Sequence, residues 1–400
     1  QANSSGGKVV FSQVHLESDP TQFENNEDKK QTLNKSNQVR FEILSDILST
    51  HLGLHCCTTM PDFKYTPAYF LGTHELKQKL MDKLKPRLEG DVLKLQNISL
   101  KFCGKGVEPP EATVNFLPVL MYLCPESFNP VTYFETLQTK ELGRLVIYSE
   151  VLTTSMHLIQ GPPIAHGLAV IPCRQTTGVG RGANMWLSPD GCAMFSMQLH
   201  IPTSSLLGER LPFVQHIVSL SVVHSISKLP GLEKLELSLK WPNDIYAKSI
   251  KLGGLIINSI IINKVVILNV GCGFNLNNKY PTACINGMIE ELNKQHNKNI
   301  PQLSFEKYFA LVFTELETLL DLVNAGKQED VIKLYYKYWL HGGSEVDVKD
   351  SEGTVKRVTI TGINEYGFLK VKGGEGEFSV QPDGNSFDMM AGLIAPKMKA

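Results

Sequence analysis

A glycine-rich segment carrying one arginine has residue types that could perform chemistry: Gln175-Thr-Thr-Gly178-Val-Gly180-Arg181-Gly182. Alternate glycines let a backbone approach an anion closely and present its N–H groups. Arg181 adds a permanent charge that suits phosphate or carboxylate oxygens, and Trp186 adds a flat apolar face for a purine or another ring. The segment lacks the Gly-Lys-Ser/Thr of a P-loop and the third glycine of a dinucleotide fingerprint. By itself it predicts either an anion-binding loop or a tight hairpin turn.

Three further motifs follow this segment along the chain. They are Lys240-Trp-Pro-Asn-Asp-Ile-Tyr246, Lys251-Leu-Gly-Gly-Leu-Ile256 and Asn269-Val-Gly-Cys-Gly-Phe-Asn275. In their order and content, the four segments resemble those of eukaryotic biotin–protein ligases (holocarboxylase synthetases). The resemblance is specific over residues 145–280 and extends more loosely through Pro382-Asp-Gly-Asn-Ser-Phe-Asp388 to the end of the chain.

The resemblance implies both an activity and a fold. Such ligases activate biotin with MgATP to biotinyl-5′-AMP, release pyrophosphate, and then acylate one lysine of a carboxylase carrier domain. The implied fold class is α/β (α+β), with a central mixed sheet and flanking helices, similar to the catalytic domains of class II synthetases and of biotin and lipoate ligases. A small SH3-like β barrel is expected at the C-terminus. The implied location is the cytoplasm, with mitochondria as the second option.

The ureido ring of biotin needs hydrogen-bond donors and acceptors inside an apolar slot. The resemblance assigns biotin contacts to Thr153, Thr154, Ser155, Gln175, Gly178, Val179, Gly180, Arg181 and Lys251. Helix capping is the competing interpretation of the Thr/Ser group, because these residues commonly begin helices. Val179 stands where bacterial members often have an arginine, so the role of that arginine in closing the loop does not carry over.

Joining a carboxylate to the α-phosphate of ATP requires cations near the reacting groups. Arg181 and Lys251 match the family's two basic residues, and Asp244 matches the group that orients or deprotonates the attacking lysine, whose free pKa is about 10.4. The nucleotide contacts that the resemblance implies are Trp186, Asn243, Gly271, Gly273 and Asn275. Two alternatives stay open: Trp186 could fill the core, and Asn243-Asp244 after Pro242 could be only a turn.

Mg²⁺ is expected because the phosphates of ATP need a counter-charge. No residues that ligate a metal are assigned, because no carboxylate cage is readable and the coordination would come largely from ATP. The partners that the resemblance implies are biotin, ATP and the carrier domains of biotin-dependent carboxylases.

Other classes of function remain in competition at this stage. Lipoate ligases also form acyl adenylates, but the Lys-Trp-Pro-Asn-Asp and Lys-Leu-Gly-Gly motifs favour biotin. A role like that of an aminoacyl-tRNA synthetase is disfavoured, because the chain has no net basic charge. A non-catalytic biotin sensor or adaptor is the third reading. The N-terminal region shows no convincing helix-turn-helix that would suggest a repressor.

Composition describes a globular protein of more than one core. Its 400 residues are 42% hydrophobic and 20% charged, and the formal charge of −1 gives no general attraction to nucleic acid or anionic membranes. Eight cysteines without CxxC or zinc-like spacing predict reduced thiols. No apolar run approaches the length that a membrane helix needs.

The periodicity of apolar residues predicts four regions. These are an arm expected to be disordered (1–37), an N-terminal domain (38–137), a central domain (138–335) and a small β barrel (336–400). The resemblance implies that the central domain is the biotin/ATP catalytic domain, and the N-terminal domain is a candidate for contact with the carrier. Helices are expected from residue 39 and near 73–84, 213–226, 305–323 and 329–340. Strands are expected at 142–148, 166–172 and 192–199, in a hairpin of 255–262 with 265–270, and in the tail at 345–348, 355–360, 368–371 and 377–380.

Overall fold

A computed structural model describes residues 9–13, 16, 27–54, 63–180, 185–278, 282–349, 353–374, 376–382, 385–388 and 393–396. The chain forms two compact units, residues 1–62 with 398–400, and residues 63–397. In the first unit, helix α1 (Glu27–Asp46) continues into a π-helical turn, η2 (Ile47–His51). Residues 27–37, expected within a disordered arm, are therefore helical. Glu27 and Asp28 fall in the first turn, where acidic side chains stabilise a helix.

The second unit is built on a twelve-stranded sheet in the order β11-β12-β13-β14-β10-β7-β6-β1-β5-β4-β3-β2. Its first five strands are β1 (Ala68–Leu71), β2 (Leu88–Glu89), β3 (Val92–Lys94), β4 (Ser99–Cys103) and β5 (Phe116–Leu120). Strand β1 pairs antiparallel with β6 (Val146–Leu152). The expected domain boundary near residue 137 is therefore not a break, because main-chain hydrogen bonds carry one sheet across it.

The other half of the sheet positions the motifs. Its strands are β7 (Ala169–Gln175), β10 (Cys192–Pro202), β11 (Leu237–Lys240), β12 (Asp244–Ala247), β13 (Ile250–Ile262) and β14 (Val265–Asn275). The expected hairpin is confirmed as β13–β14, and Asn263 and Lys264 in its turn have φ angles of 49° and 63°. Two consecutive positive φ angles are what a two-residue type I′ turn requires.

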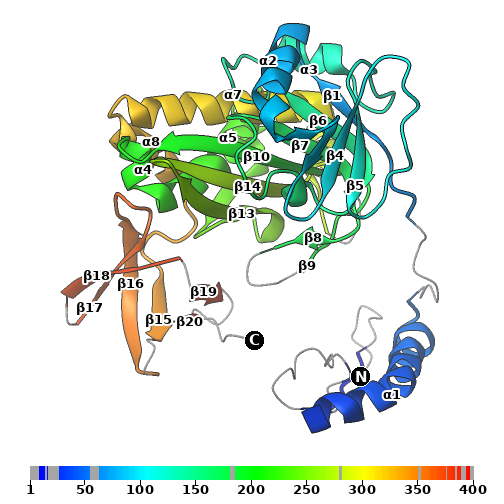
Figure 1. Cartoon of the computed structure of the whole chain (residues 1–400). Coiled ribbons are helices and arrows are strands. Elements are labelled where there is room, and N and C mark those ends of the chain that lie inside the picture. The colour runs from blue at the N-terminus through cyan, green and yellow to red at the C-terminus, as the bar shows by residue number, and fades with distance from the viewer. Residues whose placement is uncertain are drawn as a thin grey trace. The chain divides into compact units, whose positions relative to one another are not determined.

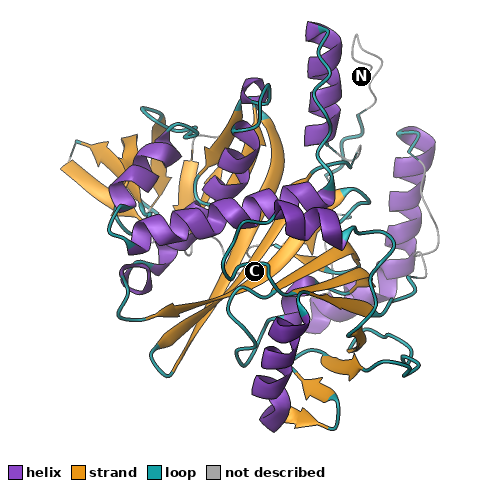
Figure 2. Ribbon diagram, turned by 90° about the horizontal axis from the view of Figure 1, so that it is seen from above, coloured by secondary structure: helices purple, strands orange, loops and turns teal. Residues whose placement is uncertain are grey.

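Helices cover this sheet (Figures 1 and 2). They are α2 (His74–Leu84), α3 (Pro130–Thr136), α4 (Leu206–Glu209), α5 (Val214–Ser227), α6 (Ile285–His296), α7 (Phe305–Asn324) and α8 (Gln328–Tyr336). The ring of Phe195 on β10 meets Phe309 and Phe313 of α7 edge-on, at centroid distances of 6.3 and 4.9 Å. Helix α8 ends before the predicted residue 340, because the main chain of Tyr338 and Leu340 hydrogen-bonds with Leu239 of β11.

The tail forms the small β domain of the expected fold class. Its six strands are β15 (Glu345–Lys349), β16 (Val355–Ile363), β17 (Leu369–Gly373), β18 (Gly376–Val380), β19 (Asn385–Asp388) and β20 (Leu393–Pro396). Four of the six were predicted. The two short strands that were not are β19, which lies within the motif Pro382–Asp388, and β20, which follows that motif. The carbonyl of Gly367 accepts hydrogen bonds from Nε2 of His216 on α5 and Nε1 of Trp241, so this domain is joined to the motif segments.

Two expectations about the whole chain can be checked directly. Cys103, Cys124, Cys173, Cys192, Cys272 and Cys284 carry free thiols, as predicted; Cys56 and Cys57 lie outside the described residues. In the part of the chain that the structure describes, no helix is long and apolar enough to cross a membrane.

Candidate functional site

The motif segments surround one cavity of about 490 Å³. Its walls come from the turn after β6, from β7, the short hairpin of β8 (Gly178–Val179) with β9 (Met185–Trp186), β10, the β12–β13 region, β14 and strand β19 of the C-terminal domain. The predicted site residues that line it are Thr154, Ser155, Gln175, Val179, Gly180, Trp186, Asn243, Asp244, Lys251, Gly271 and Gly273. Arg181, predicted to be catalytic and to bind biotin, lies outside the described residues.

One wall of the cavity is a chain of neutral polar groups. The amide N–H and the hydroxyl of Ser155 donate to Oε1 of Gln175 at 2.7 and 3.1 Å. The Ser155 hydroxyl also lies 2.7 Å from the hydroxyl of Ser196 on β10. Capping does not explain the Thr/Ser group, because Thr154 begins the 3-10 turn η4 (Ser155–Leu158) without a side-chain cap hydrogen bond. Thr154, Ser155 and Ser196 are all buried.

Thr153 holds the glycine-rich hairpin in place from outside the cavity. Its carbonyl accepts hydrogen bonds from the backbone N–H and the hydroxyl of Thr177, at 2.9 and 3.3 Å. Its side chain is buried and is not among those that line the cavity. The carbonyl of Thr153 thus positions the hairpin, and the contact of its side chain with biotin stays a prediction.

Another part of the lining carries three charged side chains. Lys251 Nζ lies 2.7 Å from Asp244 Oδ1, and Lys240 Nζ lies 3.6 Å from Asp244 Oδ2. Gly254 leaves room beside this pair, since a Cβ there would lie 3.4 Å from Asp244 Oδ1. One carboxylate thus faces two ammonium groups, which leaves a net positive charge for an anionic ligand. No role was predicted for Lys240 from its motif.

The indole ring of Trp186 lies at the surface of the cavity rather than in the core. A Cβ on Gly273 of β14 would come within 2.5–2.7 Å of three ring atoms, so the ring packs directly on the glycine backbone. The core-filling alternative for Trp186 is wrong, because the residue is half-buried and borders the cavity. The side chain of Met156 packs on Gly271 in the same way, since a Cβ on Gly271 would lie 2.9 Å from the methionine sulfur. Gly178 pairs with Trp186 in the hairpin and lies behind the lining.

The two predicted asparagines make structural hydrogen bonds. Asn243 Nδ2 donates to the carbonyl of Leu255, whose own N–H donates to the carbonyl of Asn243. The side chain thereby fixes the start of β12 against β13 while still bordering the cavity. Asn275 Nδ2 donates to Thr282 Oγ1 at 2.7 Å and to the carbonyl of Ala283, and it does not line the cavity. Asn275 braces the segment after β14, and its contact with the nucleotide stays a prediction.

Several lining residues were not predicted from the sequence: Met156, Met194, Ser196, Lys240, Trp241, Asn385 and Phe387. The sequence did contain a signal for Ser196. It is a polar residue inside the apolar run of β10, two positions from Met194 and therefore on the same face of the strand. The register of β10 and β14 places Met194 opposite Gly273 and Ser196 opposite Gly271. No comparable local signal marks Phe387, which reaches the cavity from a different domain.

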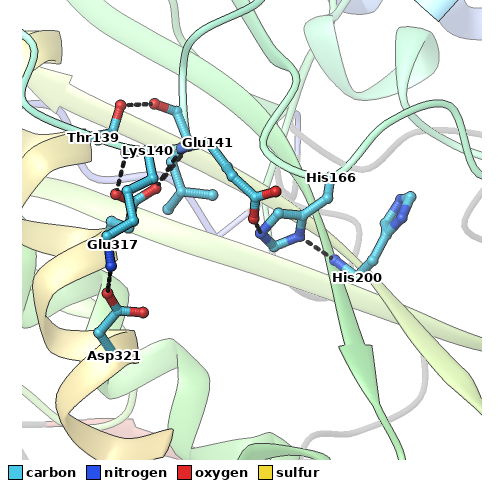
Figure 3. Close-up of polar contacts among 8 residues, drawn as sticks. Thr139, Lys140, Glu141, His166, His200, Glu317 and Asp321 are labelled. Carbon is cyan, nitrogen blue, oxygen red and sulfur yellow. Dashed lines mark hydrogen bonds and ion pairs between the residues drawn. The ribbon is translucent and has the colours of Figure 1, made fainter.

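A second cavity, of about 420 Å³, lies at the far end of β10 beside the end of α7. Figure 3 shows the polar side chains around it. Glu317 accepts three backbone N–H bonds from residues 140–142. Nδ1 of His166 accepts the backbone N–H of His200 at 2.9 Å, and burial lowers the pKa of His200 to about 4. These groups are engaged with the protein itself, so we assign this cluster to structure.

No group of three or more His, Cys, Asp or Glu side chains able to hold a metal ion occurs among the described residues. Of the described residues that line the larger cavity, Asp244 alone has a carboxylate. The described part of the lining therefore offers a bound metal one carboxylate.

Comparison with known proteins identifies a family. The model of the biotin/lipoate A/B protein ligase family matches residues 153–275, and that of the biotin protein ligase C terminal domain matches residues 341–390. A biotin–protein ligase of Homo sapiens is 40% identical over 98% of this chain, which spans 55% of that relative's length. Biotin–protein ligase 2 of Arabidopsis thaliana is 30% identical over 68% of this chain and 83% of its own length. Among solved structures, a biotin protein ligase from Aquifex aeolicus in complex with biotin and ATP is similar over 60% of this chain and 96% of its own, with 22% identity and a TM-score of 0.46.

Proposed function

Since this chain belongs to the biotin–protein ligase family, we propose that it forms biotinyl-5′-AMP from biotin and ATP and transfers biotin to a lysine of a carrier domain. The observation that carries the proposal is the division of the cavity into two halves. A neutral polar group of Ser155, Gln175 and Ser196 and a charged group of Asp244 and Lys251 line the same cavity, and strand β14 lies between β10, which carries Ser196, and β13, which carries Lys251. The first half suits a cyclic urea and the second suits a carboxylate meeting a phosphate.

In the proposed first step, a carboxylate oxygen of biotin attacks the α-phosphorus of ATP. A P–O bond forms to biotin, and the P–O bond to pyrophosphate breaks. Negative charge develops on the phosphate oxygens, where a positioned cation lowers the barrier. Lys251 supplies that cation, because it lines the cavity and its side chain is 45% exposed, so it has room to turn from Asp244 to the ligand.

In the proposed second step, a lysine amine of the acceptor attacks the acyl carbon of the adenylate. The new C–N bond replaces the C–O bond to AMP, and the amine must give up a proton. Asp244 is placed to orient the amine and accept that proton, because its carboxylate borders the cavity and is 18% exposed. Movement of Lys251 toward the phosphate would leave Oδ1 of Asp244 available for the incoming amine.

Mg²⁺ belongs to the same proposal as the partner of ATP. The lining provides one carboxylate, Asp244, which fits an ion that keeps phosphate and water ligands and does not fit a cage made by protein alone. When bound, the ion neutralises charge on the phosphates. The acceptors we propose are the carrier domains of biotin-dependent carboxylases, consistent with the 40% identity to a human biotin–protein ligase.

The test is ATP–pyrophosphate exchange by the full chain, with biotin or lipoate as the acid. We expect exchange with biotin and at least a hundredfold less with lipoate, on the scale by which hydrogen-bonding sites reject analogues that lack the polar group. A carrier domain of a carboxylase should then become biotinylated at one lysine. Exchange only with lipoate, or binding of biotin without any exchange, would refute the proposal; the second result would favour a sensor.

A further inference from the structure

Ser196 is a buried polar residue of the neutral part of the cavity, and its own contact with a ligand has not yet been described. It lies on β10, is 1% exposed and lines the cavity opposite Gly271 of β14. Its neighbours along the strand face of the lining are apolar, including Met194 and Met156. A buried hydroxyl in such surroundings costs free energy unless each of its hydrogen-bonding groups is satisfied.

The direction of its hydrogen bond follows from the neighbouring groups. The backbone N–H of Ser155 can only donate, so the Gln175 atom facing it at 2.7 Å is the amide oxygen. That same oxygen accepts the hydroxyl proton of Ser155 at 3.1 Å. A hydroxyl has one proton, so the 2.7 Å contact between the two serine hydroxyls uses the proton of Ser196.

Ser196 therefore donates to Ser155 and keeps its acceptor lone pairs. No described residue donates a hydrogen bond to Oγ of Ser196. An acceptor in this position, bordering the cavity, suits a ligand that brings an N–H group. Ligands with a dithiolane ring, such as lipoate, have no N–H to offer and would leave the serine oxygen unpaired.

We propose that Oγ of Ser196 accepts one ureido N–H of biotin and is a further specificity-determining residue of the acyl site. The inference rests on the proposed function, because it concerns the acid that this cavity activates. The hydrogen-bond series from Ser196 through Ser155 to Gln175 orients the acceptor. The hydroxyl protons of both serines are used within this series, so neither points toward the ligand. The chemical class selected is a cyclic urea, or another ring with an N–H at the same place.

A purely structural role of Ser196 would be to brace Ser155. The two roles differ in how they respond to the ligand. A brace affects every acid that uses the site equally, whereas an acceptor affects only acids that offer the matching N–H. Biotin methylated at one or the other ureido nitrogen separates them, because each analogue removes one N–H and keeps the rest of the ring.

The experiment measures KM and kcat for adenylation of biotin and of both N-methylated analogues by wild type and Ser196→Ala. We expect KM for biotin to rise about tenfold in Ser196→Ala, with kcat and KM for ATP within about twofold of wild type. For one of the two N-methylated analogues, KM should be the same in Ser196→Ala as in wild type. Ser196→Thr, which keeps a hydroxyl, should restore most of the affinity.

The matched control is Ser221→Ala on α5. Ser221 is equally buried and its hydroxyl donates within the helix to the carbonyl of Val218, away from the cavity. Melting temperatures establish that each variant is folded, and Ser196→Cys, which keeps the volume and weakens the acceptor, serves if the alanine variant unfolds. An unchanged KM for biotin, or an equal loss for biotin and both analogues, overturns the inference. If wild type itself does not adenylate biotin, the proposed function fails instead.

Discussion

At the scale of single residues, the charged part of the cavity lining centres on one carboxylate that two lysines share. Asp244 pairs with Lys251 at 2.7 Å and lies 3.6 Å from Lys240. Pairing keeps the two reactive groups of opposite sign in one place before any ligand arrives. In the function proposed above, Lys251 acts first as the cation and Asp244 acts second as the base.

Lys251→Ala should lose adenylate formation while the fold persists. A positioned charge at the reacting phosphate contributes roughly 3–4 kcal/mol, so exchange should fall by about 10²–10³-fold. Lys251 is half exposed and its removal leaves no cavity in the core, so the melting temperature should change little. Pyrophosphate exchange measures the effect, with the exposed Lys234→Ala as control. Near-wild-type exchange would show that Lys251 is not the catalytic cation.

Gly273→Ala should weaken nucleotide binding through Trp186. The new methyl group would lie 2.5–2.7 Å from the indole ring, so the ring must leave its place on β14. We expect KM for ATP to rise about tenfold or more, on the scale of losing a base–aromatic stack, with a smaller change in KM for biotin. Gly374→Ala, where a Cβ meets nothing within 4 Å, is the control. An unchanged KM for ATP would separate Trp186 from the nucleotide.

At the scale of elements, Glu317 of α7 anchors the segment that leads into β6. Its carboxylate accepts three backbone N–H bonds, at 2.5–2.9 Å (Figure 3). Bonds to a charged acceptor are stronger than neutral ones, although contributions within one group do not add fully. One side chain thereby fixes the position of a whole strand relative to the covering helix.

Glu317→Ala should lower the free energy of unfolding by about 2–4 kcal/mol, since three donors lose their acceptor. Asp321→Ala is a control from the same helix, because it removes only an ion pair with Lys140 in which both side chains are more than half exposed. That variant should change stability by less than about 1 kcal/mol. Urea unfolding compares them. Equal effects of the two variants would contradict the anchoring role of Glu317.

Elements with strong local signals were predictable from the sequence, and their partners were not. The hairpin at Asn263-Lys264 and helix α7 follow from turn residues and apolar spacing. Local sequence does not encode which strand lies beside which, so the addition of β1–β5 to the catalytic sheet was missed. The same reason explains Asn275 and Ser196. Asn275 belongs to a motif and Ser196 to none, and only the register of β10 on β14 and the chain after β14 decide which one faces the cavity.

At the scale of the molecule, buried histidines join the C-terminal domain to the motif segments. His216 donates to the carbonyl of Gly367, and Nε2 of His341 accepts the backbone N–H of Trp241. Burial lowers the pKa of each of the two imidazoles to about 4, with the charge of Lys240 as the smaller cause for His341. Both are therefore neutral in the folded protein near neutral pH.

Stability should fall as the pH drops from 6.5 toward 4. In this range the unfolded chain, with histidine pKa values near 6.5, binds protons that the folded protein excludes, so acid favours unfolding. Each buried, neutral imidazole contributes its full share to the free energy of unfolding above pH 6.5. Between pH 6.5 and pH 4 the free energy of unfolding should fall by roughly 3 kcal/mol per imidazole. Urea unfolding across this range measures it, and His216→Asn should flatten the slope. Constant stability between pH 7 and 4.5 would contradict the neutral, buried state.

The continuous sheet also changes how the N-terminal region must be tested. A truncation beginning at residue 138 would remove β1 from its pairing with β6. It would therefore expose a central strand as an edge, and loss of activity would report damage to the sheet. Substitutions at exposed side chains, such as Tyr122 or Leu123 (52% and 60% exposed), are the cleaner probe of carrier contact.

The packing of Trp186 on Gly273 has an optical consequence. The chain has three tryptophans; Trp241 is fully buried with its N–H on Gly367, and Trp339 packs among Tyr335, Tyr336 and His341. Whereas Trp241, which also borders the cavity that is expected to admit a purine, is fully buried, Trp186 is half-buried and lines that cavity. Its ultraviolet emission should therefore dim or shift when a nucleotide arrives. Intrinsic tryptophan fluorescence should therefore report nucleotide binding in the cavity without an added label.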